Sequence, residues 1–416
     1  MIDYADLAPN AAASAPPSAG SQRARVVGWW KAHRLAVVES LVLLVGLRTV
    51  LSLIAALAVA LLPEQRGLHE VFHRSGNLWL DVWARWDSEY YLDIAEYGYG
   101  LRSELLAFFP LYPVVVSAVA GLLPGHQLLA AVVVSTLASF VAFVYLFKLA
   151  SLELGPGGAG RALLYLAIYP TALFLVAVYA EALFLALVLA AFYHARRGQW
   201  ALAGLAAFCA GLTRPNGVVL ALPLAYEAVR PWLERQTRPE RGSIWRALGA
   251  LAAAGAAPLG FALWAAYLWW LTGDPLTVVH RVGTPPWERV SSLPWATVAV
   301  AFQTLAQVDL PAYARASNTI DLTFAVLLIE ASIVVWWRLP RAYAIYLTAS
   351  TLFLLSSTVN RFPMQSLPRY SLVLFPLFLL LAQLGANRRW HTLIVLVSAP
   401  LLGLFTALYT TWYWVF

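Results

Sequence analysis

Cysteine and charged side chains are scarce in this chain of 416 residues. The single cysteine, Cys209, lies within an apolar run, so the chain can form neither an internal disulfide nor a cysteine-based metal cluster. Charged residues make up 12% of the sequence and hydrophobic residues 61%, far from the composition of soluble globular proteins. Neither a P-loop nor a Rossmann glycine pattern is present. These shortages disfavour a soluble, disulfide-stabilised or nucleotide-binding protein.

Long apolar runs make up most of the sequence instead. Many of them extend over about 17–25 residues, which is long enough for a helix to cross the hydrocarbon core of a bilayer. They lack the alternation of apolar and polar residues that the strands of a membrane barrel require. The net charge of +7 and the pI of about 9.5 come from basic residues scattered among the loops, which is typical of membrane topology and not of nucleic-acid binding. We therefore expect an all-α, polytopic integral membrane protein.

The basic residues also predict the orientation of the chain. Arginines and a lysine within 23–34 precede the first apolar run, which places the N-terminus in the cytoplasm by the positive-inside rule. We divide the chain into a basic, disordered cytoplasmic segment, 1–34, and a single transmembrane catalytic domain, 35–416. Its first external loop, 63–125, should contain amphipathic helices. About eleven spans are expected, at residues 36–62, 127–150, 160–177, 181–195, 199–213, 216–229, 246–271, 319–337, 342–358, 370–386 and 391–413.

Acidic residues are concentrated in this external loop. Eight of the 21 carboxylates fall between Glu64 and Glu104, although charge close to a bilayer is costly unless it serves solvation, binding or catalysis. In a helix, Glu89, Asp93 and Glu96 would share one face. Such a stripe is typical of a solvated acidic surface.

Asp87 stands apart from this stripe, because it follows Trp86 directly and precedes the expected helix. Its carboxylate could cap that helix. It could also act as a general base, because a partly dehydrated carboxylate in an aromatic setting is a competent proton acceptor. Glu89 is the second candidate for this catalytic role.

Several short segments between residues 80 and about 380 form an ordered set. They are Arg85–Tyr91, Ile94–Glu96, Gly98–Tyr99, Ala107–Pro113, Tyr179–Phe184, Thr213–Gly217, Gly273–Pro275, Trp287–Arg289, Pro368–Ser371 and Phe375–Pro376. In this order they closely resemble the PIG-V-type mannosyltransferases, a branch of the GT-C glycosyltransferases. Each segment alone is a weak signal, but the ordered set is specific. The short loops and the Ala/Pro/Ser-rich N-terminal tail look like those of a bacterial member.

The resemblance implies a GT-C-like helical bundle that takes a sugar, mannose in this family, from a polyprenyl-phosphate carrier at the outer face of the membrane. For a bacterial member this is the extracytoplasmic face of the plasma membrane. It implies a single displacement with inversion, in which Asp87 deprotonates the acceptor hydroxyl. No cofactor is required, and a divalent metal is possible but not favoured. The expected partners are the bilayer, the lipid-linked donor and a glycan, glycolipid or protein acceptor, with no nucleic acid.

Further residues are implied in donor and substrate binding. Arg369 would meet the donor phosphate, because a guanidinium can bind phosphate with two hydrogen bonds. Glu181 would hold a sugar hydroxyl or a basic partner, unless it only complements the dipole at a helix start. The arginines could instead be surface or membrane-end residues, and the histidine could be structural. The full set is Arg85, Trp86, Tyr90, Tyr91, Glu181, Arg214, Asn216, His280, Arg281, Arg289, Arg369 and Tyr370.

Two other functions remain open at this point. The segment His69–His73 matches the H-E-x-x-H pattern of zinc proteases. Against a zinc site, no convincing third ligand follows this pattern, and Asp81 is the nearest candidate. A non-catalytic transporter or lipid-handling protein would also explain the helix interruption at Arg214 and Pro215. A transporter needs polar groups near the membrane midplane, whereas the groups named above are expected at the outer face.

Overall fold

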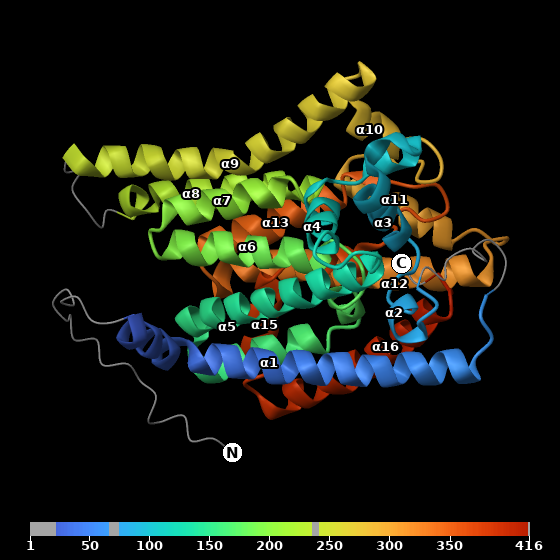
Figure 1. Ribbon diagram of the computed structural model, residues 1–416, viewed down its shortest axis with the longest axis horizontal. Coiled ribbons are helices and arrows are strands. Elements are labelled where there is room, and N and C mark those ends of the chain that lie inside the picture. Colours follow the sequence, from blue (N-terminus) through green and yellow to red (C-terminus); the bar gives the residue numbers. More distant parts are fainter. Residues whose placement is uncertain (1–21, 66–74, 235–240, 415–416) are drawn as a thin grey trace.

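The apolar runs form helices that lie side by side along the long axis of the molecule (Figure 1). The computed structural model describes residues 22–65, 75–234 and 241–414, with side chains for 33–65, 75–234 and 247–414. The first half of the bundle consists of α1 (Gln22–Leu61), α5 (Gln127–Ala167), α6 (Glu181–Arg196), α7 (Trp200–Gly211), α8 (Ala221–Leu233) and α9 (Arg241–Thr272).

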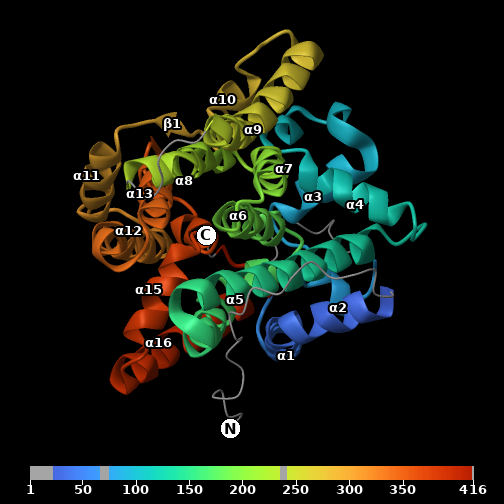
Figure 2. The same cartoon turned by 90° about the vertical axis from the view of Figure 1, so that its left-hand side faces the viewer.

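The second half of the bundle consists of α12 (Ala312–Arg338), α13 (Arg341–Leu354), α15 (Pro376–Leu384) and α16 (Arg388–Thr410). Viewed along the helices, α6 lies near the centre, with α5, α7, α8, α13 and α15 around it (Figure 2). Twelve of the sixteen residues of α6, Glu181 among them, are buried. The first residue of α6 is therefore enclosed by protein on all sides.

Five helices in the described part of the chain are long and apolar enough to cross a membrane: His33–Leu61, Gln127–Ala167, Ala247–Thr272, Ala312–Arg338 and Arg388–Thr410. The expected all-α integral membrane protein is thereby confirmed. The remaining expected spans correspond to shorter helices, so the number of about eleven full-length spans stays a prediction.

Two of the expected spans have a different form in the structure. The expected spans 127–150 and 160–177 are joined in α5, which has a kink where Gly155 adopts φ 71° and continues to Ala167. The expected span 160–177 therefore ends early and is followed by the 3-10 turn η4 (Ala172–Leu175). The expected span 370–386 is split into α14 (Leu367–Ser371) and α15. Prolines at the starts of both pieces favour two short helices over one long helix, because proline fits the first turn and not the interior.

Small residues bring α7 and α9 into close contact. A side chain at Gly211 would collide with the carbonyl of Ala257, and one at Gly260 would collide with the carbonyl of Phe208. Glycine at such crossings lets helix backbones approach each other inside a membrane. This contact places the end of α7, and with it the residues that follow Gly211, against α9.

Short elements gather at one end of the bundle, at the right of Figure 1. They are α2 (Leu78–Asp81), α3 (Ser88–Tyr97), η2 (Gly98–Gly100), η3 (Ser103–Ala107), α4 (Leu111–Ala120), α10 (Thr277–Val282), α11 (Pro294–Leu305) and α14. A two-residue antiparallel pair, β1 (Val290–Ser291) with β2 (Ser357–Thr358), ties two of the loops together. The expected helices of the first external loop are therefore present, and they lie where several loops converge.

Candidate active site

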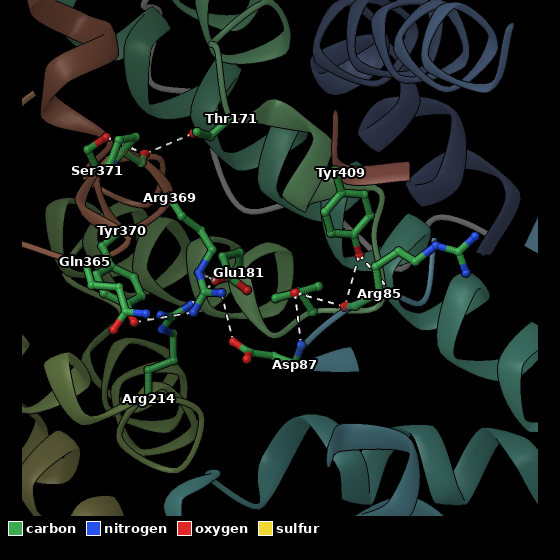
Figure 3. A network of polar contacts seen from close by, with 12 residues as sticks. Arg85, Asp87, Thr171, Glu181, Arg214, Gln365, Arg369, Tyr370, Ser371 and Tyr409 are labelled. Atoms are coloured by element: carbon green, nitrogen blue, oxygen red, sulfur yellow. Dashed lines mark hydrogen bonds and ion pairs between the residues drawn. The ribbon is translucent and has the colours of Figure 1, made fainter. Parts of the chain in front are cut away.

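Four charged residues from distant parts of the sequence meet at this end of the bundle (Figure 3). Asp87 precedes α3, and Glu181 is the first residue of α6. Arg214 precedes the 3-10 turn η5 (Pro215–Leu220), and Arg369 lies within α14. Asp87, Glu181 and Arg214 stand at helix starts, where a polar group can leave an apolar run without interrupting it, and Arg369 lies in the middle of a helix of five residues.

The four side chains form a continuous chain of ion pairs. Arg369 donates from Nη1 to Asp87 Oδ2 at 2.8 Å, and its Nε lies 3.1 Å from Glu181 Oε1. The Nη1 of Arg214 lies 2.5 Å from the same oxygen of Glu181. Glu181 is 0% exposed and Arg369 is 7% exposed, so the charges are compensated by each other and not by water. Of the two roles expected for Glu181, the structure shows the basic partner.

The carboxylate of Asp87 does not cap α3. No side-chain hydrogen bond joins it to the first turn of that helix, and it accepts from Arg369 instead. The capping interpretation of Asp87 is therefore wrong. The stripe on α3 is also not a fully solvated face, because Asp93 is buried and pairs with Arg102.

The backbone around Asp87 is held by two buried tyrosines. The hydroxyl of Tyr179 accepts from the Asp87 N–H at 3.2 Å and donates to the carbonyl of Arg85 at 3.0 Å. The hydroxyl of Tyr409 accepts from the Arg85 N–H at 3.2 Å. Between these anchors, Trp86 adopts φ 56°, a left-handed conformation that costs about 1–3 kcal/mol for a bulky residue. The tyrosines hold the chain in this conformation and thereby aim Asp87 at Arg369.

The helix α14 is anchored from both sides. Thr171 and Ser371 each donate a hydroxyl to the carbonyl of Pro368, at 3.0 and 2.7 Å (Figure 3). On the other side, α14 packs against α12, where Asp321 is 2% exposed. These contacts place Arg369, the second residue after Leu367, beside Asp87.

Two cavities adjoin this network. We call the first, of about 480 Å³, the arginine cavity, because Arg214, Arg289 and Arg369 line it. Its other polar lining residues are Asp87, Thr213, Asn216, Ser291, Ser356, Ser357, Tyr91 and Tyr370. Apolar side chains, among them Phe109, Phe261, Val279 and Leu354, line the rest.

We call the second, of about 370 Å³, the tryptophan cavity. It is lined by Trp86, Asp87, Glu89, Tyr90, Pro286, Trp287, Tyr313, Phe362, Gln365 and Trp414. Asp87 and Trp287 line both cavities. The carboxylate of Asp87 therefore stands on the boundary between a basic cavity and an aromatic one.

Arg289 differs from its two neighbours in the arginine cavity. It donates to Ser357 Oγ and to the carbonyl of Gln365, each at 3.4 Å, and forms no ion pair with a carboxylate of the described residues. All three arginines lie near the ring of Tyr370. The Cζ atoms of Arg214 and Arg369 are each 5.0 Å from the centre of this ring, and the Cζ of Arg289 is 5.9 Å from it. Burial would raise the pKa of its hydroxyl, but these guanidiniums outweigh burial and lower it. The cavity thus has an excess of positive charge.

The structure brings together most of the residues expected in the site, but not all of them. Arg85 is fully buried and donates to the carbonyls of Asp81 and Thr410, away from both cavities. His280 forms an exposed pair with Asp274, at 2.7 Å. Their roles in binding stay predictions.

Two further candidate site residues form ion pairs with oppositely charged side chains. Arg281 pairs with Glu104 at 3.0 Å and lines neither cavity. Glu89 lines the tryptophan cavity and pairs with Arg102 at 2.9 Å. Of the two candidate bases, Asp87 lines both cavities and Glu89 lines the tryptophan cavity alone. The catalytic role of each acid stays a prediction.

Sequence reasoning missed several residues that shape the site. Gln365, Tyr313, Phe362 and Trp414 line the tryptophan cavity, and Tyr179 holds the backbone of Asp87. Of these, only Tyr179 stood in a segment that resembled a family motif. Aromatic residues are common throughout this sequence, so nothing local marked the others.

No group of three or more His, Cys, Asp or Glu side chains that could hold a metal occurs in the part of the chain that the structure describes. The segment 69–73 with the H-E-x-x-H pattern lies outside the described residues, as does most of the N-terminal segment 1–34.

Fold and site together define an all-α integral membrane protein with an enclosed, charged site at one end of its helices. Residues 35–238, about half of the chain, match the family described as Mannosyltransferase (PIG-V). Over this stretch the chain belongs to that family, and the family expected from the motifs is confirmed. No curated protein sequence matches the chain at a significant level.

Among solved structures, the chain is similar to the oligosaccharyltransferase of Archaeoglobus fulgidus. The form tethered with an acceptor peptide aligns with TM-score 0.42 and 12% identity, over 93% of this chain and 56% of that chain. The complex with an inhibitory peptide and a dolichol-phosphate aligns with TM-score 0.41 and 12% identity, over 92% of this chain and 56% of that chain. The chain thus spans little more than half the length of these proteins.

Proposed function

We propose that this protein is a membrane glycosyltransferase that transfers mannose from a polyprenyl-phosphate carrier to an acceptor hydroxyl, with Asp87 as the general base. The observation that carries the proposal is the position of Asp87, which is a lining residue of both cavities. A base in that position can receive a proton from an acceptor on one side while the reacting carbon lies on the other. The family match over residues 35–238 supports the reaction class.

The lipid-linked donor occupies the arginine cavity in this proposal. Its phosphate faces Arg289, the arginine there that forms no ion pair with a carboxylate of the described residues, with Arg214 and Arg369 close by. Charge-assisted hydrogen bonds from guanidinium groups are well suited to phosphate oxygens. The first isoprene units of the carrier lie along apolar lining residues such as Phe261 and Leu354.

The reaction is a single displacement at the anomeric carbon. Asp87 accepts the proton of the acceptor hydroxyl as its oxygen bonds to that carbon, and the bond from the carbon to the phosphate oxygen breaks. The polyprenyl phosphate leaves with the bonding electron pair, and the arginines offset its developing charge. Attack opposite the leaving group inverts the configuration. Arg369 orients the base, because it holds Asp87 Oδ2 at 2.8 Å.

The arrangement favours this enzyme over a transporter. Asp87, Glu181 and Arg214 stand at helix starts and Arg369 lies in the short helix α14, all at one end of the bundle, whereas transporters bind their substrates near the midplane. We place this end at the extracytoplasmic face and the N-terminus in the cytoplasm, because basic residues precede the first long helix.

Replacement of Asp87 by Asn tests the proposal. Asp87→Asn keeps the size and polarity of the side chain but cannot accept the proton, so transfer of radiolabelled mannose from its polyprenyl-phosphate carrier in proteoliposomes should fall by about 10²–10⁴-fold. Glu96→Gln is the matched control, because Glu96 lies on the exposed face of α3 and lines neither cavity. Transfer by Asp87→Asn within a few-fold of the wild type would remove Asp87 from the mechanism.

A further inference from the structure

A third cavity, with a basic lining, lies at the end of the bundle opposite to the candidate active site, and we call it the distal cavity. Its volume is about 480 Å³, and it is lined by Arg161, Trp337, Arg338 and Gln383, with Leu154 and two alanines as its apolar part. These residues come from α5, α12, α15 and the turn that follows α15. The helix α15 packs against both α5 and α12 (Figure 2), so the cavity is formed between packed helix ends.

The helix α12 shows how far the distal cavity lies from the candidate active site. Tyr313, in the first turn of α12, lines the tryptophan cavity, and Arg338 is the last residue of the same helix. Roughly 25 residues of helix separate the two by about 37 Å, which exceeds the hydrocarbon thickness of about 30 Å. Trp337 and Trp390 are 76% and 51% exposed, and exposed tryptophans gather at membrane interfaces. The distal cavity therefore lies at the level of the lipid headgroups of the opposite leaflet.

The positive charge of the distal cavity is not compensated by acids. No Asp or Glu of the described residues lines it, and Arg161 and Arg338 form no ion pair with a carboxylate of those residues. Arg196, at the same end of the bundle, pairs instead with Glu153 at 2.9 Å and with Glu227 at 3.4 Å. Topology alone explains why arginines gather at this end, but not why two of them without acidic partners line one cavity between helices.

Hydrogen bonds between helices hold the walls of the distal cavity in place. The Nε of Arg161 donates to the carbonyl of Ala382 at 2.9 Å, which fixes the guanidinium against α15. The Nε2 of Gln383 donates to the carbonyl of Arg338 at 3.1 Å, which ties α15 to the last turn of α12. The cavity is therefore preorganised, and a ligand would not have to order it.

We propose that the distal cavity binds the phosphate headgroup of an anionic phospholipid from the leaflet opposite to the candidate active site. The guanidiniums of Arg161 and Arg338 hold the phosphate. Arg388 and Arg389 line an adjoining cavity of about 640 Å³ and add positive charge beside it. The exposed ring of Trp337 meets the glycerol and the first acyl carbons. A soluble phosphate could use the same arginines but would leave this apolar wall uncovered. The inference is independent of the proposed function.

Native mass spectrometry of the protein released from detergent micelles tests this site. The probes are phosphatidylglycerol and phosphatidylcholine with the same acyl chains, and the wild type should retain phosphatidylglycerol preferentially. An arginine beside an anionic lipid contributes a factor of about five in affinity. Retention of phosphatidylglycerol should therefore fall about fivefold in Arg338→Gln and about twenty- to thirtyfold in the double variant with Arg161→Gln. Arg338 is exposed, so the single variant should fold like the wild type.

Arg341→Gln is the matched control, because it removes the same charge from an exposed arginine at the start of α13 that lines neither of these two cavities. It should retain phosphatidylglycerol like the wild type. An equal loss in Arg341→Gln and Arg338→Gln would reduce the effect to net charge and overturn the site, as would equal retention of the two lipids by the wild type. Displacement of phosphatidylglycerol by millimolar inorganic phosphate would assign the arginines to a soluble anion and overturn the lipid proposal. Lipid retention is measured without donor or acceptor, so its outcome is separate from the transfer assay of Asp87→Asn.

Discussion

Arg369 is held by two carboxylates at once, and its replacement by lysine tests whether this geometry supports catalysis. In the structure, Nη1 donates to Asp87 at 2.8 Å and Nε faces Glu181 at 3.1 Å. The planar guanidinium can make both contacts because its nitrogens point in different, fixed directions. The ammonium of lysine keeps the charge but has its three donors on one nitrogen, so Arg369→Lys should not reproduce the two contacts that Nη1 and Nε make in separate directions.

The magnitude follows from the lost contact. A hydrogen bond to a charged group contributes about 1.5–3 kcal/mol. At about 1.4 kcal/mol for each factor of ten, the loss of either contact should lower kcat/KM by roughly ten- to more than a hundredfold. Because Glu181 is fully buried and also retains Arg214, the fold should persist. Most of the effect should fall on kcat, since Asp87 loses the partner that orients it.

The assay is transfer from polyprenyl-phosphate mannose in proteoliposomes over a range of donor concentrations. Arg315→Lys is the control, because Arg315 donates to the backbone carbonyls of Leu305 and Gln307 at the exposed start of α12 and lines neither cavity. If Arg369→Lys keeps kcat/KM within roughly threefold of the wild type, the bridging geometry does not matter for catalysis, and the argument that Arg369 orients Asp87 is refuted.

Three more predictions follow from the site and its orientation. Arg289→Gln should raise the KM for the donor by about ten- to a hundredfold with a smaller change in kcat, because it removes the cation that we assign to the phosphate; an unchanged KM would place the phosphate elsewhere. Tyr179→Phe removes the hydroxyl that bonds the backbone on both sides of Trp86, so kcat should fall by about tenfold while donor KM stays the same; wild-type kcat would show that the clamp is dispensable. Ser103→Cys, made in a Cys209→Ala background, should react with an impermeant thiol reagent on intact cells; labelling only after lysis would invert the proposed topology.

Much of the fold could be predicted from the sequence, because the relevant signals are local. The apolar runs predicted the long helices, and Pro215 and Gly217 predicted the interruption that becomes η5. The expectation failed where neighbouring residues gave a misleading signal. The run 160–177 is apolar enough to span a membrane, yet its second half is a buried irregular segment that ends at Glu181. Its backbone groups find partners in other parts of the chain instead: the N–H of Val178 donates to the carbonyl of Trp83, and the hydroxyl of Ser139 donates to the carbonyl of Leu175. No local pattern records such partners.

The candidate site was only partly visible in the sequence. Asp87 was identified from its neighbours and from the family resemblance, but its side-chain partner could not be inferred. Arg369 lies 282 positions later in the sequence, and many other arginines of the chain could equally have been the partner of Asp87. The capping interpretation failed for the same reason, because a strong cation from another helix outweighs a backbone N–H as partner for a carboxylate.

The sequence by itself indicated a helical membrane protein with an acidic loop, and residues 35–238 belong to the PIG-V family that its motifs predicted. Hydropathy, charge placement and short motifs act over a few neighbouring residues, so they can be read without a structure. Only the tertiary structure decided that Asp87, Glu181, Arg214 and Arg369 form one buried network, and that one carboxylate separates a basic cavity from an aromatic one. The reason is physical: buried charges must be compensated by whatever opposite charge packing brings within about 4 Å, and packing is a property of the whole chain.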